Sequence, residues 1–277
     1  MEYKALYEMG EKGLKQAGIE EYALDARLLL EETCSTSRSD LFAHGDRQVG
    51  QEQCERYLRL IDKRKRHIPL QHILGCQEFM GLKFKVTPDV LIPRQDTETL
   101  VEEVMRILRD GMRILDLCTG SGCILLSLLK YSNSCQGVGS DLSKKALLVA
   151  RENARSLSLS AEFVQSDLFE NIEGKFEIIV SNPPYIPSGE IPLLMEEVRD
   201  HDPLMALDGG GDGLYFYREI IKRADRYLYP GGRLFFEIGC KQGAQVSSLM
   251  EKAGYGEITV YQDLSGLDRV VTGIYIG

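Results

Sequence analysis

The sequence predicts an α/β fold in which a doubly wound sheet follows a small helical bundle and a β-hairpin linker. After Arg94, strand-like and helix-like segments alternate, which is typical of a sheet with helices on both faces. Before residue 75, apolar residues recur at helical spacing instead. The 277 residues also suit roughly two domains by length. We therefore predict a helical domain at 1–74, a linker at 75–93 and an α/β domain at 94–277.

The first 74 residues contain three amphipathic stretches. Their apolar positions are Leu6, Met9, Leu14 and Ala17, then Leu24, Leu28 and Leu29, then Cys54, Tyr57, Leu58 and Ile61. The basic run at 63–66 ends the third stretch, where cations meet the C-terminal dipole of a helix, so we expect a solvated helix end there.

Two short extended stretches follow the helical part. Residues 78–86 partly alternate between apolar and polar side chains, and residues 89–93 are apolar. We predict that they form a β-hairpin linker.

The α/β part is predicted to contain seven strands with helices between them. The expected strands are 112–117, 135–141, 161–165, 176–181, 232–238, 257–262 and 269–276. The expected helices are 97–109, 122–131, 144–157, 213–228 and 242–253. Right-handed crossovers place the ligand crevice of such a sheet at the carboxyl ends of its strands.

The first of these strands runs into a small-residue loop, Cys118-Thr119-Gly120-Ser121-Gly122. Glycine after a strand lets a ligand approach the backbone, although a plain tight turn is the alternative for the loop taken alone. A dinucleotide fingerprint needs a small residue three positions after Gly122, and Leu125 stands there. The loop therefore argues against NAD.

Acidic residues end the next two strands. Asp141 lies 21 positions after Gly120, where a carboxylate accepts both hydroxyls of a ribose. Asp167 and Leu168 end the third strand beside an adenine-sized space. A nucleoside without a pyrophosphate fits this pattern, and helix capping or turn formation is the alternative for each aspartate.

The segment Ser181-Asn182-Pro183-Pro184-Tyr185 follows the apolar strand at 176–180. We interpret it as a clamp for a planar NH2 group, whose lone pair is delocalised and whose two N–H bonds need acceptors. The Asn182 side-chain oxygen and the Pro183 carbonyl are the candidate acceptors, and Tyr185 offers a flat ring. A proline turn that closes the strand is the alternative.

Composition and charge narrow the class of protein. The chain is 43% hydrophobic and 27% charged, without an apolar run near the roughly 20 residues of a membrane span or a secretory signal pattern, so we predict a cytoplasmic protein. Its net charge of −9 does not suit nonspecific nucleic-acid binding. Seven cysteines without a Cys-x-x-Cys pair and four scattered histidines predict reduced, mostly buried thiols and no metal site.

Together these motifs resemble class I S-adenosylmethionine-dependent methyltransferases that act on a conjugated NH2 group of adenine, cytosine or glutamine. The wider match is to the HemK/PrmC family, which methylates the side-chain nitrogen (N5) of the glutamine in the Gly-Gly-Gln motif of class I peptide chain release factors. The matching segments run nearly end to end, at 25–30, 69–75, 84–94, 181–187, 208–217 and 268–271.

The resemblance implies a Rossmann-like, seven-stranded mixed sheet, S-adenosylmethionine as methyl donor and S-adenosylhomocysteine as product. It assigns cofactor binding to Cys118, Thr119, Gly120, Ser121, Gly122, Asp141, Asp167, Leu168 and Asn182, and the glutamine amide to Asn182, Pro183, Pro184 and Tyr185. The expected partner is a release factor, recognised by the N-terminal helices. We expect a monomer that makes no direct contact with nucleic acid.

Three positions depart from the family pattern. Cys118 replaces a residue that is often glycine, and we expect it to be tolerated at negative φ. Leu168 stands where some relatives have an aromatic residue, which weakens stacking on adenine. The segment 94–98 lacks a common proline, and we expect Asp96 or Thr97 to cap the following helix.

Two other functions remain open at this point. A nucleic-acid methyltransferase would flip a base into the same clamp, but the acidic α/β part and the lack of a target-recognition domain count against it. A sensor of S-adenosylmethionine would have no use for Asn182 and Tyr185. The long segment 186–212 is expected to order when a protein substrate docks, and His201 within it to be a solvated loop residue and not a base.

Overall fold

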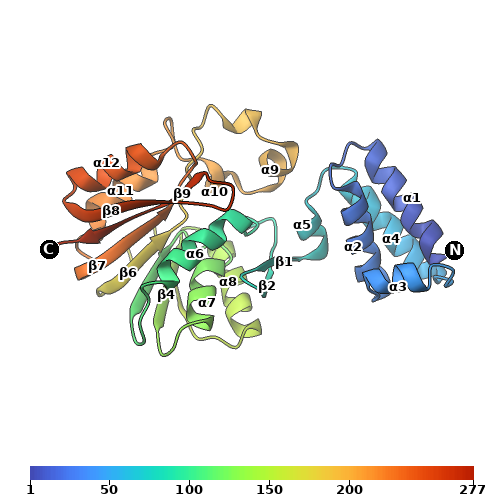
Figure 1. Cartoon of the computed structure of the whole chain (residues 1–277), viewed down its shortest axis with the longest axis horizontal. Helices are drawn as coiled ribbons and strands as arrows, with labels where there is room; N and C mark the ends of the chain where they lie inside the picture. The colour runs from blue at the N-terminus through green and yellow to red at the C-terminus, as the bar shows by residue number, and fades with distance from the viewer. The chain divides into compact units, whose positions relative to one another are not determined.

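The computed structural model describes residues 1–277, which form two compact units (Figure 1). The first contains Met1–Gly75 and Met195–His201, and the second contains Cys76–Leu194 and Asp202–Gly277. The first unit is helical, and the second holds a seven-stranded sheet. No helix is both long and apolar enough to cross a membrane.

The first unit is built from five helices and one segment from far along the chain. Its helices are α1 (Tyr3–Gln16), α2 (Tyr22–Cys34), α3 (Arg38–Ala43), α4 (Gln51–Arg64), α5 (Leu70–Leu74) and, from the distant segment, α9 (Glu196–His201). Leu6, Leu14, Leu29, Tyr57 and Ile61 are buried in its core. They are among the apolar positions that the helical spacing predicted, and their burial supplies the main driving force for this bundle. Two other predicted positions, Met9 and Leu24, are exposed, so the spacing was wrong for them.

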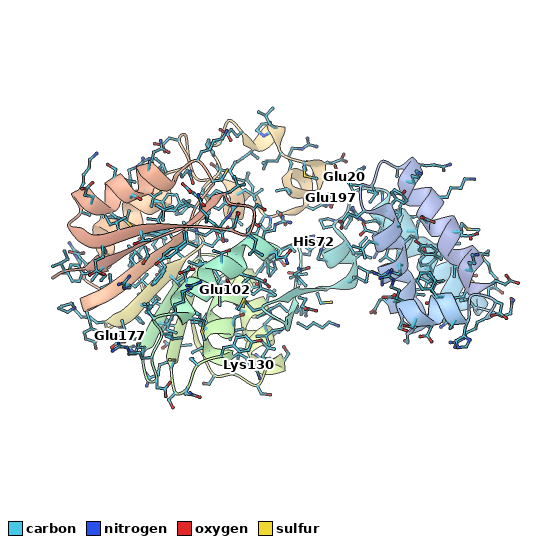
Figure 2. All side chains as sticks on the ribbon, in the orientation of Figure 1. Glu20, His72, Glu102, Lys130, Glu177 and Glu197 are labelled. Atoms are coloured by element: carbon cyan, nitrogen blue, oxygen red, sulfur yellow. The ribbon has the colours of Figure 1, made fainter.

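The basic run at the end of α4 is not fully solvated, contrary to our expectation. Arg64 is only 5% exposed. Its Nε donates to Asp25 Oδ2 at 2.6 Å, and its Nη2 donates to Glu197 Oε1 at 2.6 Å. Glu197 belongs to α9 (Figure 2). The prediction of a solvated side chain was wrong for Arg64 because two carboxylates distant in sequence neutralise its charge. The planar guanidinium group of arginine is well suited to pairing with carboxylates in a buried position.

The linker contains a β-hairpin, as predicted, but the hairpin lies within residues 76–85. Its strands β1 (Cys76–Phe79) and β2 (Leu82–Lys85) are antiparallel. Met80 and Gly81 join them with φ values of 51° and 68°, which is typical of a two-residue hairpin turn. The stretch 89–93, which we expected to form the second strand, is not a strand, and its apolar residues Val90 and Ile92 are buried without strand pairing.

The sheet contains β3 (Arg113–Leu117), β4 (Gln136–Asp141), β5 (Glu162–Gln165), β6 (Phe176–Ser181), β7 (Leu228–Glu237), β8 (Tyr255–Gln262) and β9 (Asp268–Tyr275). Their spatial order is β5-β4-β3-β6-β7-β9-β8. The strands β5, β4, β3, β6 and β7 are parallel to one another, whereas β9 pairs antiparallel with both β7 and β8. The mixed seven-stranded sheet expected from the resemblance is confirmed.

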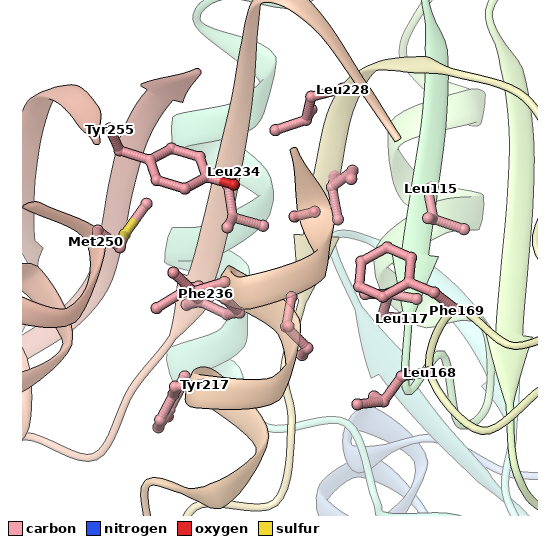
Figure 3. Packing of buried hydrophobic residues seen from close by; sticks show 14 of the residues in the cluster. Leu115, Leu117, Leu168, Phe169, Tyr217, Leu228, Leu234, Phe236, Met250 and Tyr255 are labelled. Atoms are coloured by element: carbon pink, nitrogen blue, oxygen red, sulfur yellow. The ribbon is translucent and has the colours of Figure 1, made fainter. Parts of the chain in front are cut away.

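Helices cover both faces of this sheet. They are α6 (Glu98–Met105), α7 (Cys123–Lys130) and α8 (Lys144–Ser156) on one face, and α11 (Tyr215–Ala224) and α12 (Gly243–Lys252) on the other. Along β3, Leu115 and Leu117 pack toward α11 and α12, while Ile114 packs toward α6 and α7. Figure 3 shows Tyr217 and Met250 of these helices beside the sheet residue Phe236. Apolar side chains on both faces explain the continuous apolar runs of the central strands.

The segment between β6 and α11 is more ordered than a plain loop. It contains the short helices η2 (Ile191–Leu193), α9 and α10 (Leu204–Leu207). Near its two ends, Ile186 N donates to Leu207 O at 3.0 Å and Gly209 N donates to Ile186 O at 2.9 Å. His201 lies at the end of α9 and is half-buried, so the expected solvated loop position was wrong.

The cysteines differ from expectation in their burial. All seven are free thiols, but only Cys123 is buried and Cys240 is exposed. The prediction of mostly buried thiols was wrong because several lie at the ends of helices and strands, where one side faces solvent.

Candidate active site

The order of the strands creates a crevice at the carboxyl ends of β3 and β6. The chain winds from β3 outward through β4 to β5 and then returns to the other side of β3 with β6. Ligands bind at such a reversal in open α/β sheets. Leu117 and Ser181 end the two strands in register, and Ser181 Oγ donates to Leu117 O at 2.8 Å. The glycine loop and the Asn-Pro-Pro-Tyr segment therefore leave adjacent strands at one edge.

A cavity of about 440 Å³ opens at this edge, a size that suits a small ligand. Nine of the predicted site residues line it, namely Cys118, Thr119, Gly120, Ser121, Asp141, Asp167, Leu168, Asn182 and Pro184. Gly122, Pro183 and Tyr185 are absent from its walls. The structure thus brings together residues from four successive strand ends.

The glycine loop is held by hydrogen bonds of the chain itself. Thr119 N donates to Ser140 O at 2.9 Å, and Thr119 Oγ1 donates to Asp116 Oδ2 at 2.6 Å. At Gly120, with φ of +55°, an added Cβ would meet no atom within 4 Å. The backbone of this residue is therefore accessible to a ligand on the cavity side.

Cys118 adopts φ of +59°, in the left-handed region. The expectation of a negative φ was wrong, because the chain must bend sharply between the end of β3 and Thr119. A side chain at such a φ costs roughly 1–2 kcal/mol, which accounts physically for a preference for glycine at this position.

Asp141 stabilises the loop as well as facing the cavity. Its Oδ2 accepts from Gly120 N at 2.9 Å and its Oδ1 accepts from Ser143 N at 2.8 Å. The helix cap of α8 is Ser143 instead, whose side chain accepts from Ala146 N. Burial raises the pKa of Asp141, and those two backbone bonds oppose the rise. Because each carboxylate oxygen accepts about two hydrogen bonds, acceptor capacity remains for a ligand.

Asn182 and Pro184 of the Asn182–Tyr185 segment line the cavity, whereas Pro183 and Tyr185 do not. Asn182 is half-buried on the cavity wall, and its Nδ2 donates to Thr97 Oγ1 in a long contact of 3.5 Å. Tyr185 packs partly against the sheet core, where its hydroxyl donates to Glu237 Oε1 at 3.4 Å and its carbonyl accepts from Gln242 Nε2 at 3.0 Å. The structure therefore does not bring the Tyr185 ring to the cavity as the clamp hypothesis expected.

Comparison with known proteins decides the family. The PrmC N-terminal domain model matches residues 5–75, and the methyltransferase small domain model matches residues 95–197. A release factor glutamine methyltransferase of Geobacter sulfurreducens is 41% identical over 94% of this chain and 92% of its own length. One from Moorella thermoacetica is 43% identical over 92% of each. The chain belongs to the release factor glutamine methyltransferase family.

A solved methyltransferase from Pyrococcus furiosus shares the fold of this family member. It has a TM-score of 0.55 at 18% identity and covers 70% of this chain and 89% of its own. The family, the fold class and the enzyme class that the sequence predicted are all confirmed.

The family member's cavity also has walls that the sequence did not reveal. Val90, Leu91 and Pro93, which we assigned to the linker, line it, as do Leu204 and Phe216. Only their apolar character was visible in the sequence, and it did not distinguish a cavity wall from a core contact.

Asp116 is a second site residue that the sequence analysis missed. It is completely buried under the loop, burial raises its pKa to about 7, and its Oδ1 has no hydrogen-bond partner. An acidic residue inside an otherwise apolar strand was the available signal.

Neither predicted cap of α6 forms in this family member. Thr97 precedes α6 without a side-chain capping bond, and Asp96 Oδ2 pairs with Arg269 Nη2 at 3.0 Å. Both residues lie in the 3-10 turn η1 (Gln95–Thr97), whose helical backbone does not suit a capping side chain. Thr97 is 2% exposed and contacts Asn182 instead.

Proposed function

We propose that this protein transfers a methyl group from S-adenosylmethionine to the side-chain amide nitrogen of the glutamine in the Gly-Gly-Gln motif of a class I peptide chain release factor. The observation that carries the proposal is the position of Asn182 on the wall of the cavity beside the glycine loop. Curated relatives that match nearly the whole chain bear the name of this activity.

The cavity residues fit S-adenosylmethionine. Asp141 retains acceptor capacity for ribose hydroxyls, Leu168 and Phe216 provide apolar wall for adenine, and Gly120 leaves its backbone accessible. When bound, the cofactor supplies a methyl carbon on a sulfonium, which is already activated for in-line displacement. A solved 16S rRNA methyltransferase of T. thermophilus in complex with AdoMet shares the fold, with a TM-score of 0.54 at 20% identity over 72% of this chain and 49% of its own.

The acceptor side orients a weak nucleophile. The lone pair of an amide nitrogen is delocalised into its carbonyl, so acceptors on the two N–H bonds increase the electron density on nitrogen. Asn182 Oδ1 and the Pro183 carbonyl are the acceptors that we propose. The nitrogen gains the methyl group and releases one proton, and the main contributions of the protein are positioning and exclusion of water.

We further propose that the N-terminal helical unit recognises the release factor. Residues 1–75 of this unit contain 12 Lys and Arg against 13 Asp and Glu, and this balance suits a folded protein surface better than a phosphate backbone. We expect a monomer that acts in the cytoplasm without direct nucleic-acid contact.

The test is transfer of labelled methyl from S-adenosylmethionine to purified release factor, with mass spectrometry of the Gly-Gly-Gln peptide and unmethylated duplex DNA as a parallel acceptor. We expect label on that glutamine. Asn182→Ala should reduce turnover about 100-fold or more, since it removes an acceptor used in the transition state, and should lower cofactor affinity far less than turnover. Asn133→Ala, at an exposed asparagine, is the matched control. Label on DNA alone would move the protein to the nucleic-acid class, and label on neither acceptor would favour a sensor.

A further inference from the structure

A buried carboxyl group lies behind the Asn-Pro-Pro-Tyr segment. Glu237 is the last residue of β7 and is 2% exposed. Its Oε1 accepts from the Tyr185 hydroxyl at 3.4 Å, and the Thr97 hydroxyl faces the same carboxyl group. Thr97 Oγ1 in turn accepts from Asn182 Nδ2 at 3.5 Å. One carboxyl group therefore connects to both ends of the segment that we assign to the acceptor amide.

Glu237 is not satisfied as a purely structural residue would be. Its Oε2 is buried and has no hydrogen-bond partner. A buried polar atom without a partner costs about 1–3 kcal/mol, and native proteins contain few of them. Thr97 is also buried, and its hydroxyl can both donate and accept a hydrogen bond, so it can contact Asn182 and Glu237 at the same time.

The donors and acceptors in this series of contacts can be assigned from the chemistry of the side chains. An ionised carboxylate only accepts, so the Tyr185 hydroxyl donates to Oε1, and the Thr97 hydroxyl is the neighbouring donor that can turn its proton toward the carboxylate, whose Oε2 has no other partner. Thr97 then has only lone pairs left for Asn182, which must offer its NH2 group. The Asn182 side chain is thereby fixed with Nδ2 toward Thr97 and Oδ1 away from it.

We propose that Glu237 and Thr97 are positioning residues for glutamine methylation: the carboxylate of Glu237, acting through the Thr97 hydroxyl, holds the Asn182 side chain in the orientation that presents Oδ1 to the substrate amide. This inference rests on the proposed function. Neither residue touches the acceptor in this account, and both act through Asn182 and Tyr185.

The charge of Glu237 depends on its surroundings. Burial raises its pKa to about 7, opposed by Thr97 and Arg269 and assisted by Asp96. The other titratable groups that interact with it, Tyr185, Tyr217 and Cys123, have pKa values raised by burial and are neutral near pH 7. Glu237 is thus the group in this cluster that titrates near neutral pH, and the directed arrangement forms as the pH rises through about 7.

The test compares Thr97→Val with Thr97→Ser in the methyl-transfer assay with purified release factor. Valine preserves the shape of threonine and removes the hydroxyl, whereas serine restores the hydroxyl. We expect kcat of Thr97→Val to fall about tenfold, the effect of one lost hydrogen bond in the transition state, and Thr97→Ser to recover most of it. Affinity for S-adenosylhomocysteine, measured by calorimetry, should be unchanged in both variants and shows that they are folded.

A pH profile tests the role of the carboxylate. Wild-type kcat should rise with pH through an apparent pKa near 7, and Glu237→Gln, which cannot ionise, should lose that step and have about tenfold lower kcat at pH 8. The inference would be overturned if kcat of Thr97→Val equalled that of the wild type, or if the valine and serine variants lost equal amounts of kcat. It would also be overturned if the pH dependence of kcat were the same in Glu237→Gln as in the wild type. Wild-type protein that does not label glutamine would overturn the proposed function, and this inference with it.

Discussion

The two units of the molecule each bury a charged side chain, and they treat it differently. In the N-terminal unit, Arg64 is 5% exposed and is matched by Asp25 and Glu197, with a further bond from its Nη1 to Ile68 O at 3.3 Å. In the catalytic unit, Glu237 is 2% exposed, and its Oε2 lacks a hydrogen bond.

The difference indicates what each charge is for. A buried ion pair contributes little net stability over an apolar core, but loss of one partner is expensive, so Arg64 is suited to specify which segments pack together. A buried acid whose pKa is raised toward neutrality is more typical of a functional site.

The largest effect is expected from Arg64→Met. This change leaves the buried Asp25 and the half-buried Glu197 without their cation, so the free energy of unfolding of the N-terminal unit should fall by about 3–5 kcal/mol. Denaturant unfolding measures it. The matched control is Lys65→Met, because Lys65 is a more exposed neighbour that pairs only with Asp62 and should change stability by less than about 1 kcal/mol. Equal losses in the two variants would contradict a special role for Arg64.

The next effect concerns the pH dependence of stability in the catalytic unit. The pKa of Glu237 is raised from 4.5 to about 7 in the folded state, so between these values the folded protein holds more protons than the unfolded chain. Stability therefore decreases as the pH rises through this window, by about 3 kcal/mol for this group. Unfolding of Glu237→Gln across pH 4 to pH 8 should lack that decrease.

A control glutamate separates this effect from general charge changes. Glu251 is exposed on α12, and Glu251→Gln should have the wild-type pH profile. Asp116 remains in both variants, and burial also raises its pKa to about 7, so some decrease with pH should persist in Glu237→Gln. An unaltered profile in that variant would show that Glu237 does not ionise in this range.

Asp141 provides an intermediate case, a half-buried acid whose two oxygens both accept from backbone N–H groups. Asp141→Asn is nearly isosteric but replaces one acceptor oxygen with a donor. We expect affinity for S-adenosylhomocysteine to fall about tenfold, or about 1.4 kcal/mol, with a smaller change in kcat at saturating cofactor. Calorimetry measures the affinity. A loss in kcat alone, without a loss in affinity, would mean that Asp141 affects turnover, as we propose for Glu237, and does not bind the cofactor.

The sequence predicted the fold and most of the residues that line the cavity, for a physical reason. Strand periodicity, the Gly120–Gly122 loop and the acid at Asp141 are local features, each determined by a few consecutive residues. The strand order then follows from handedness and short connections. Tertiary partners were less accessible, as Thr97 shows: its spacing suggested a cap, but its partners Asn182 and Glu237 are far along the chain.

Arg64 and Glu197 illustrate the same limit in the N-terminal unit. They are 133 residues apart in sequence, and neither is distinguished from a surface charge by its neighbours. The sequence also placed every residue after 94 in the α/β domain. In the structure, the segment Met195–His201, which contains α9, belongs to the unit of residues 1–75, whereas the residues on either side of it belong to the catalytic unit. Pairing of charges across such distances leaves no periodic signal in a single sequence.

The smallest change in the free energy of unfolding is expected at Cys118, an uncharged residue with a strained backbone. It shows how much stability changes at the cavity when no charge is altered. Cys118 has φ of +59°, which costs roughly 1–2 kcal/mol for a residue with a Cβ, whereas glycine adopts this φ readily but loses about 0.5–1 kcal/mol more conformational entropy on folding. Cys118→Gly should therefore raise the free energy of unfolding by up to about 1 kcal/mol, independent of pH between 5 and 8, because burial keeps the pKa of this thiol far above that range. Thermal unfolding at several pH values tests this. A gain in stability that varied with pH would mean that the loop conformation is coupled to the charges of Asp116 and Asp141, both of which raise the pKa of the Cys118 thiol. The effect of backbone strain could then not be separated from the effect of charge in this loop.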